Sequence, residues 1–222
     1  MQKNNSMNNK LEVALKRLTT ILPLKKSQDS CPPEIKVLHQ QMLRSFVTNG
    51  RILTRDEMAQ WVDDVPEAVN VLSQYDMVTF SERGDPVGAY PFAMMAREHK
   101  VQVNGHQIHA MCALDALAIA PMFGETMQVM SQCWVTGKPV QINMCGETIL
   151  NLAEVQDVHV GIAWSAAVAD SCCADSLCLE MIFLRDAETA QKWLSDYTAS
   201  REIFTLQEAV QFATRFFVPL LS

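Results

Sequence analysis

The sequence lacks any long apolar run, and no stretch reaches the roughly 18 uncharged apolar residues of a membrane-spanning helix. Its first ten residues, MQKNNSMNNK, are polar and contain no apolar core of the kind that secretory signals have. Glycine and proline are few, at 8 and 9 of 222 residues, whereas 49% of the residues are apolar. We therefore expect a cytoplasmic globular protein with one good-sized core or two small ones.

Positive charge is also scarce. The chain has 18 Lys and Arg residues against 25 Asp and Glu residues, which gives a net charge of −7. Such a charge repels nucleic acid and anionic lipid unless a local basic patch overrides it, and none is evident beyond the first 26 residues. We expect neither nucleic acid nor a membrane as a partner.

The spacing C-x-x-C is absent, although the chain has seven cysteines. The missing spacing argues against a thioredoxin-type redox site and a zinc ribbon. An odd number of cysteines in a reducing compartment favours thiols over a disulfide framework. A cysteine hydrolase would need a histidine base, and the nearest candidates, His106 and His109, lie on a predicted hairpin strand where they can simply face solvent.

The first 76 residues read as helices. Residues 9–22 have helical spacing with Asn9 as a cap, and a polar linker containing SQDSCPP follows, which predicts a loosely attached arm. A helix from 32 to 50 opens on proline and closes on glycine, Thr54 and Glu57 form a capping box for a second helix, and a third runs from Pro66 to about Gln74.

The strands MVTF and GAYPFAM flank the turn SERGDPV, so this segment resembles a winged helix-turn-helix. Between Ile52 and Tyr90, however, eight acidic residues oppose only Arg55 and Arg83. Because phosphate contacts supply much of the affinity for DNA, we favour a structural role over DNA binding.

The second half is predicted to be rich in strands. Asn104-Gly105 is the turn of a hairpin, TMQVMSQCWV and VQINM form a second pair, and VHVGIAW and LCLEMIFL add two strands. Helices begin at Asp186 and at Thr205, the latter with a capping box. The predicted class is α+β, with a winged-helix-like helical segment followed by a mainly antiparallel sheet domain with flanking helices. The expected divisions are 1–30 (arm and linker), 31–95 and 96–222.

The stretch HAMCALDALAIAPMFG holds a cysteine and a carboxylate inside an apolar segment. Cys112 and Asp115 are three residues apart, so on a helix they share a face. One interpretation is structural: Cys112 is a buried thiol that packs like a small apolar residue, and Asp115 bonds backbone amides at the helix start. The other is chemical, because the dipole and free amides at a helix start lower a thiol pKa and favour a thiolate.

Cys178 and the Cys172–Cys173 pair allow two interpretations each. Cys178, in the predicted strand LCLEMIFL, belongs to the core or is a ligand. Cys172–Cys173, in the predicted loop ADSCCADS, is an ordinary surface pair or an exposed trap for a soft metal. Packing roles are expected for Cys133 and Cys145, and a free thiol for Cys31 in the linker.

Residues 110–142, AMCALDALAIAPMFGETMQVMSQCWVTGKPVQI, resemble the signature region of the bacterial organomercurial lyases, also called alkylmercury lyases. The likeness rests on CALD, the following Gly124, the SxC strand and the TGxPV turn. It extends more weakly over about residues 35–217, through LCLEMIF and the later AxxW.

The resemblance implies protonolysis of a carbon–mercury bond by two cysteines and one aspartate. Cys112 and Asp115 fall on two of them, and a gapless count back from Trp193 places the second cysteine at Cys178. Cys133 falls on a further family cysteine that looks structural. The family often has two adjacent cysteines at the strand site, whereas here the adjacent pair is Cys172–Cys173, so a shifted register would make Cys173 the second ligand.

This chemistry implies that Asp115 takes a proton from the second cysteine and gives it to the carbon. An apolar site beside thiolates favours the neutral acid. We expect no cofactor: Hg(II) would remain as bound product on Cys112, Cys178 and Asp115. Low-molecular-weight thiols or a mercuric reductase would then receive it, with help from Cys172–Cys173. The alternative is a soft-metal-binding or metal-sensing protein on the same scaffold without lyase turnover.

Overall fold

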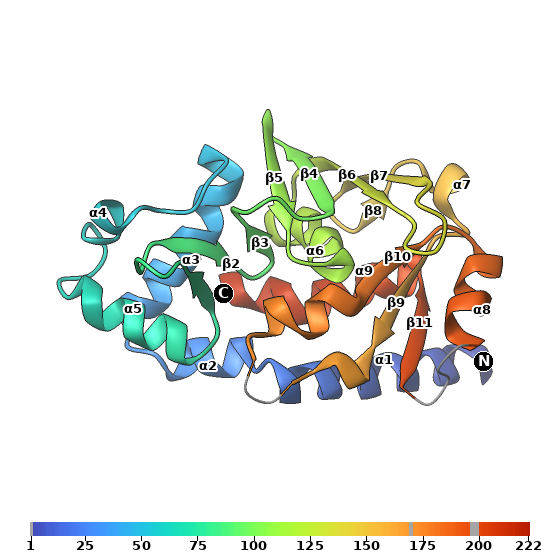
Figure 1. Ribbon diagram of the computed structural model, residues 1–222, viewed down its shortest axis with the longest axis horizontal. Coiled ribbons are helices and arrows are strands. Elements are labelled where there is room, and N and C mark those ends of the chain that lie inside the picture. Colours follow the sequence, from blue (N-terminus) through green and yellow to red (C-terminus); the bar gives the residue numbers. More distant parts are fainter. Residues whose placement is uncertain (1, 169–170, 196–199) are drawn as a thin grey trace.

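The computed structural model describes residues 2–168, 171–195 and 200–222, with side chains from residue 9 onward (Figure 1). The helices are α1 (Gln2–Ile21), α2 (Leu24–Ser30), α3 (Pro33–Asn49), α4 (Arg55–Met58), α5 (Val65–Gln74), α6 (Ala113–Phe123), α7 (Leu152–Val155), α8 (Ala187–Ser195) and α9 (Leu206–Phe217), with short 3₁₀ helices η1 (Trp164–Ala166), η2 (Cys173–Asp175), η3 (Leu177–Glu180) and η4 (Val218–Leu221). Among the described residues, no helix combines the length and apolar character needed to cross a membrane.

In the described part of the chain, the strands form two antiparallel sheets. They are β1 (Val78–Phe80), β2 (Pro86–Ala89), β3 (Phe92–Ala93), β4 (His99–Val103), β5 (His106–Ala110), β6 (Thr126–Gln132), β7 (Pro139–Cys145), β8 (Thr148–Ile149), β9 (His159–Ala163), β10 (Met181–Leu184) and β11 (Arg201–Thr205). The order is β1-β2-β3-β5-β4-β6-β7-β8 in the larger sheet and β10-β9-β11 in the smaller. The predicted α+β class is confirmed.

Local signals fix several boundaries as predicted. α3 ends at Gly50, whose φ of 69° is the left-handed conformation that glycine adopts most easily. Thr54 and Glu57 form the reciprocal capping box of α4. The β4–β5 hairpin turns at Asn104 and Gly105, both with positive φ, at 48° and 80°.

Helix α6 lies at the centre of the molecule. It packs against β4, β5 and β6 of the larger sheet, β10 of the smaller sheet, and α9 (Figure 1). All residues from 113 to 120 are buried, as expected for a helix that is apolar on nearly every side. Helix α6 is therefore enclosed by both sheets and by α9.

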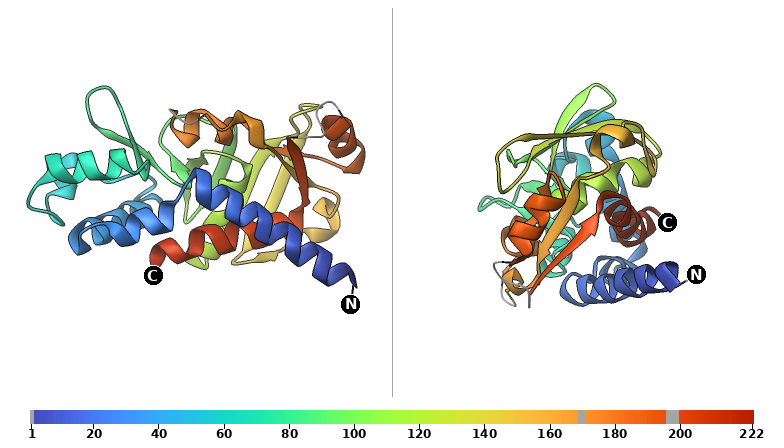
Figure 2. Two further views of the ribbon diagram at one scale, coloured as in Figure 1. Left: turned by 90° about the horizontal axis from the view of Figure 1, so that it is seen from below. Right: turned by 90° about the vertical axis from the view of Figure 1, so that its right-hand side faces the viewer.

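The expectation of a loosely attached N-terminal arm is wrong. Leu11, Ala14 and Leu18 are at most 2% exposed, and Figure 2 shows α1 beside α9, with which it is in contact. The predicted linker forms α2, and Asn9 lies inside α1 rather than capping it. The apolar stripe at helical spacing finds a complementary face on α9, which explains the close packing. The division at 1–30, 31–95 and 96–222 stays a prediction.

The segment LCLEMIFL is not a strand throughout. Its first four residues form η3, and β10 begins only at Met181. Leu177 and Cys178 are both buried while Leu179 is 49% exposed, a pattern that a helical turn produces and strict alternation does not. The short elements β8, β11 and α7 were not predicted, because elements of two to five residues leave little periodicity to recognise.

Candidate functional site

Cys112 and Asp115 meet at the start of α6. Cys112 lies two residues after the end of β5 and is the N-cap residue of the helix, with extended backbone angles of −150° and 179°. Its Sγ accepts a hydrogen bond from the backbone N–H of Asp115 at 3.3 Å. The sulfur thus takes the place of the Ser, Asp or Asn oxygen that usually caps a helix. Both side chains are buried, with 1% and 2% exposure.

Cys178 reaches the same point from η3. Its Sγ lies 3.9 Å from Oδ2 of Asp115, and one ligand atom each of Cys112, Asp115 and Cys178 lie within 4.8 Å of one another. Among the described residues this is the one group of three or more His, Cys, Asp and Glu side chains arranged to hold a metal ion. Met181 adds a thioether sulfur 3.5 Å from Cys112 Sγ. The site therefore offers several soft donors and one hard oxygen.

Burial raises the pKa of the Cys112 thiol to about 12, although hydrogen bonds with Cys178 and with the backbone N–H of Asp115 lower it. The expectation of a thiolate at this helix start is wrong, because desolvation of the charged sulfur outweighs the favourable amide. The pKa of Cys178 is also raised, by its hydrogen bonds with Cys112 and Cys173 and then by burial. Both thiols are thus protonated at neutral pH.

Burial also raises the pKa of Asp115, to about 7, against the lowering effect of hydrogen bonds from Cys112 and Cys178 and of the positive charge on Arg97. This is the direction expected for a carboxyl group in an apolar site. Near neutral pH such a group exists in both protonation states, so it can accept a proton from a thiol and return it elsewhere.

The Cys172–Cys173 pair was expected to be exposed, but the structure buries Cys173 and leaves Cys172 only partly exposed. Cys173 is 4% exposed in η2, and its Sγ lies 3.8 Å from that of Cys178. Cys172 is half-buried and points elsewhere, donating from Sγ to Oδ1 of Asp76 at 2.9 Å. The two neighbouring thiols therefore have different surroundings. Only Cys173 contacts the cluster formed by Cys112, Asp115 and Cys178.

Asp76 and Tyr90 hold this loop in place and were missed from the sequence. The Asp76 carboxylate accepts the backbone N–H of Cys173 at 2.9 Å. The Tyr90 hydroxyl donates to Asp76 at 3.1 Å and accepts the backbone N–H of Ala174 at 2.8 Å. Asp76 has a left-handed φ of 49°, but nothing in the sequence links it to a cysteine 96 residues away.

Arg97 fixes the other side of the loop and was also missed. Its guanidinium donates to the carbonyl oxygen of Ala174 at 3.2 Å and pairs with Asp175 at 2.9 Å. The loop that carries Cys173 is therefore tied to Asp76 before β1, to Tyr90 after β2 and to Arg97 before β4, as well as to η3.

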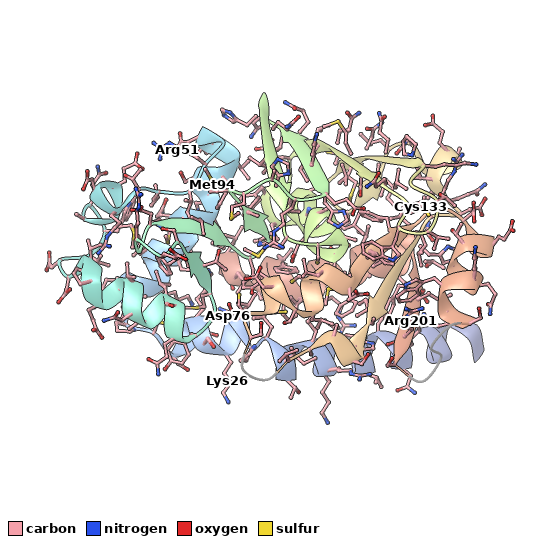
Figure 3. The ribbon with its side chains drawn as sticks, viewed as in Figure 1. Lys26, Arg51, Asp76, Met94, Cys133 and Arg201 are labelled. Carbon is pink, nitrogen blue, oxygen red and sulfur yellow. The ribbon has the colours of Figure 1, made fainter. Side chains whose placement is uncertain are left out.

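The remaining cysteines lie outside the cluster. Cys133 is fully buried after β6, Cys145 is exposed at the end of β7, and Cys31 is half-buried between α2 and α3. Figure 3 shows Cys133 far to the right of Asp76 in the view.

The histidines on β5 have other partners. His106 Nε2 lies 3.2 Å from the carbonyl oxygen of Thr48, and His109 Nδ1 contacts the backbone of Arg97. Neither belongs to the group formed by Cys112, Asp115 and Cys178. A hydrolase arrangement of cysteine and histidine is therefore not favoured.

Comparison with known proteins gives a consistent result. The family model for alkylmercury lyase matches residues 92–218. The chain is 26% identical to an alkylmercury lyase of Staphylococcus epidermidis over 73% of this chain and 74% of that protein. It is 27% identical to one of Pseudomonas putida (77% and 79%) and 23% identical to one of Bacillus cereus (90% and 90%). The fold resembles the crystal structure of the mercury-bound form of MerB2, with a TM-score of 0.72 and 20% identity over 90% of this chain and 98% of that one.

Proposed function

The chain belongs to the alkylmercury lyase family, and we propose that Cys112, Cys178 and Asp115 carry out its reaction, the protonolysis of a carbon–mercury bond. The products are a hydrocarbon and Hg(II). The observation that supports these three residues is their geometry: two thiols and one carboxyl group from distant parts of the chain lie within 4.8 Å of one another in a buried site.

The donor set suits this substrate. Mercury is a soft metal and prefers sulfur ligands, so thiols bind it strongly. A single thiolate would only store an organomercurial. A second sulfur on the metal pushes electron density onto the carbon, which can then accept a proton and leave. The buried Asp115, 2% exposed, is placed to supply that proton away from bulk water.

The proposed steps conserve protons and electrons. Cys112 first displaces the thiol that accompanies the organomercurial, and its proton leaves with that thiol. Cys178 then binds the metal as its proton passes to Asp115 over the 3.9 Å between Sγ and Oδ2. Asp115 finally transfers this proton to the carbon, the carbon–mercury bond breaks, and Hg(II) remains on the two sulfurs with Asp115 as a third ligand. The carboxylate is regenerated.

These residues supply both the metal ligands and the proton, so we propose that the reaction needs no resident cofactor. Hg(II) is then the bound product on Cys112, Cys178 and Asp115. Low-molecular-weight thiols, or a mercuric reductase, are the proposed recipients, because only another sulfur ligand competes effectively for the metal.

Gas-phase detection of methane from purified protein, methylmercury and excess thiol tests this function. The wild type and the exposed-thiol control Cys145→Ser should both release methane over many turnovers, while Cys112→Ser should release none beyond the protein-free background. Binding of mercury by the wild type without methane would instead establish the alternative, a soft-metal-binding protein without turnover.

A further inference from the structure

A surface pocket of about 390 Å³ lies next to the cluster. Among its lining residues are Asp76, Cys173 and Ser176, together with Thr20 and Ile21 from the end of α1. Cys112, Cys178 and Asp115 do not line it. Cys173 therefore belongs to both places: it lines the pocket, and its sulfur lies 3.8 Å from that of Cys178.

This position bears on how the product leaves. Hg(II) held between Cys112 and Cys178 would be buried, since these residues are 1% and 4% exposed. A soft metal moves between thiols when an incoming sulfur attacks it before the outgoing sulfur departs. Cys173 is also only 4% exposed, but it lines the pocket and the other two cysteines do not, so an external thiol in the pocket would meet Cys173 first.

We propose that Cys173 is an exchange thiol, which takes Hg(II) from the Cys112–Cys178 pair and presents it to dithiols that enter the pocket. This role rests on the proposed function. The bond from Cys173 Sγ to mercury forms and the bond from Cys112 Sγ breaks, while the Cys173 proton passes to Cys112. Hg(II) then lies between Cys178 and Cys173 without any change of oxidation state.

The second step completes the exchange. The two sulfurs of an incoming dithiol replace Cys173 and Cys178 on the metal, and the two dithiol protons pass to these cysteines. All three protein thiols are then protonated again and can accept a new substrate. Asp76 keeps Cys173 in the required place, because its carboxylate holds the Cys173 backbone N–H at 2.9 Å.

Cys172 provides a matched control in the same loop. It carries the same thiol, but its sulfur lies 2.9 Å from Asp76 and donates to the carboxylate, a bond that a serine hydroxyl can also make. Replacement of Cys172 by serine therefore changes the number of thiols and leaves the cluster contacts in place.

The test measures release of Hg(II) separately from carbon–mercury cleavage. Wild type, Cys173→Ser, Cys173→Ala and Cys172→Ser are loaded with one equivalent of mercuric chloride, and loading is checked by mass spectrometry. Each is mixed with a small dithiol in a stopped-flow instrument, and transfer of mercury is recorded. Methane release from methylmercury is measured on the same preparations. Because inorganic mercury is loaded directly, the transfer rate does not depend on lyase activity.

The two Cys173 variants should load one Hg(II) and transfer it about tenfold or more slowly than the wild type, while Cys172→Ser transfers it at the wild-type rate. Transfer by the Cys173 variants at the wild-type rate would overturn the proposal, as would an equal slowing in Cys172→Ser. Failure of both Cys173 variants to load mercury would also overturn it, because Cys173 would then be needed for binding Hg(II) and not only for its release. Absence of methane from the wild type, with slow transfer in the Cys173 variants, would refute the lyase function alone.

Discussion

The Cys178 sulfur lies 3.9 Å from a carboxylate oxygen of Asp115, although 63 residues separate the two in the chain. Both groups are buried, and the pKa of Asp115 is raised to about 7. A thiol proton can therefore pass to a carboxylate that is able to hold it and release it near neutral pH. This relationship links the metal-binding and proton-transfer parts of the proposed reaction.

Replacement of Asp115 by asparagine should separate metal binding from proton transfer. Asp115→Asn keeps the shape of the side chain and both sulfurs, so it should still bind one Hg(II). Turnover should fall by roughly 10²-fold or more, the usual effect of losing a general acid–base group. Mercury binding by mass spectrometry and methane release measure the two effects, and normal turnover would refute the role of Asp115 as proton carrier.

Serine substitutions decide which cysteine is the second ligand. Cys178→Ser should abolish methane release from methylmercury, because its sulfur is the one that shares the 4.8 Å cluster with Cys112 and Asp115. Cys173→Ser should still give methane in a single turnover. Full activity in Cys178→Ser together with complete loss in Cys173→Ser would show that Cys173 is the second ligand.

The buried carboxyl group should make the free energy of unfolding depend on pH. The pKa of Asp115 rises from 3.8 to about 7 on folding, so the folded state holds the proton more tightly, and the free energy of unfolding falls as pH rises through this window. Asp115→Asn lacks this penalty. The free energy of unfolding of Asp115→Asn minus that of the wild type should therefore be larger at about pH 8.5 than at about pH 5. The expected increase is on the order of 1 to 4 kcal/mol. Urea unfolding under reducing conditions measures it, and an unchanged difference between the two pH values would contradict the assignment.

Tyr90→Phe tests the anchor of the Cys173 loop. The substitution removes the hydroxyl that accepts the Ala174 N–H at 2.8 Å and leaves that buried donor unpaired. The free energy of unfolding should fall by about 1 to 2 kcal/mol. Tyr75→Phe, at a residue that is 39% exposed, is the control and should have little effect. Equal stability of the two variants in urea unfolding would show that the hydroxyl does not anchor the loop.

Cys133→Ser should lower stability and leave methane release intact. Burial acts to raise the pKa of this thiol, but the pKa is lowered overall. Hydrogen bonds from the Thr136 side chain and from the backbone of Arg185, Thr136 and Val135 together outweigh burial. The sulfur therefore organises the turn between β6 and β7. We expect a loss of about 1 to 2 kcal/mol in urea unfolding, against no loss for the exposed Cys145→Ser. Loss of methane release without loss of stability would indicate a chemical role for Cys133.

Local patterns in the sequence predicted much of the fold. The capping box of Thr54 and Glu57, the glycine end of α3 and the Asn104-Gly105 turn are all present where expected. These features depend on neighbours within a few residues, so a single sequence contains their cause. The close packing of α1 and the short helix η3 depend on distant partners, and there the sequence predictions were wrong.

The sequence by itself determined that Cys112 and Asp115 share the first turn of one helix, because three residues along a helix bring two side chains to one face. Only the tertiary structure determined which side chains lie next to them and which protonation state they adopt. The packing of α6 against β10 places Met181 beside Cys112, and η3 places Cys178 beside Asp115. Burial raises the pKa of Cys112, which is therefore a neutral thiol rather than the thiolate that its helix position predicted. Desolvation depends on every atom around a group, whereas a helix start depends on a few adjacent residues.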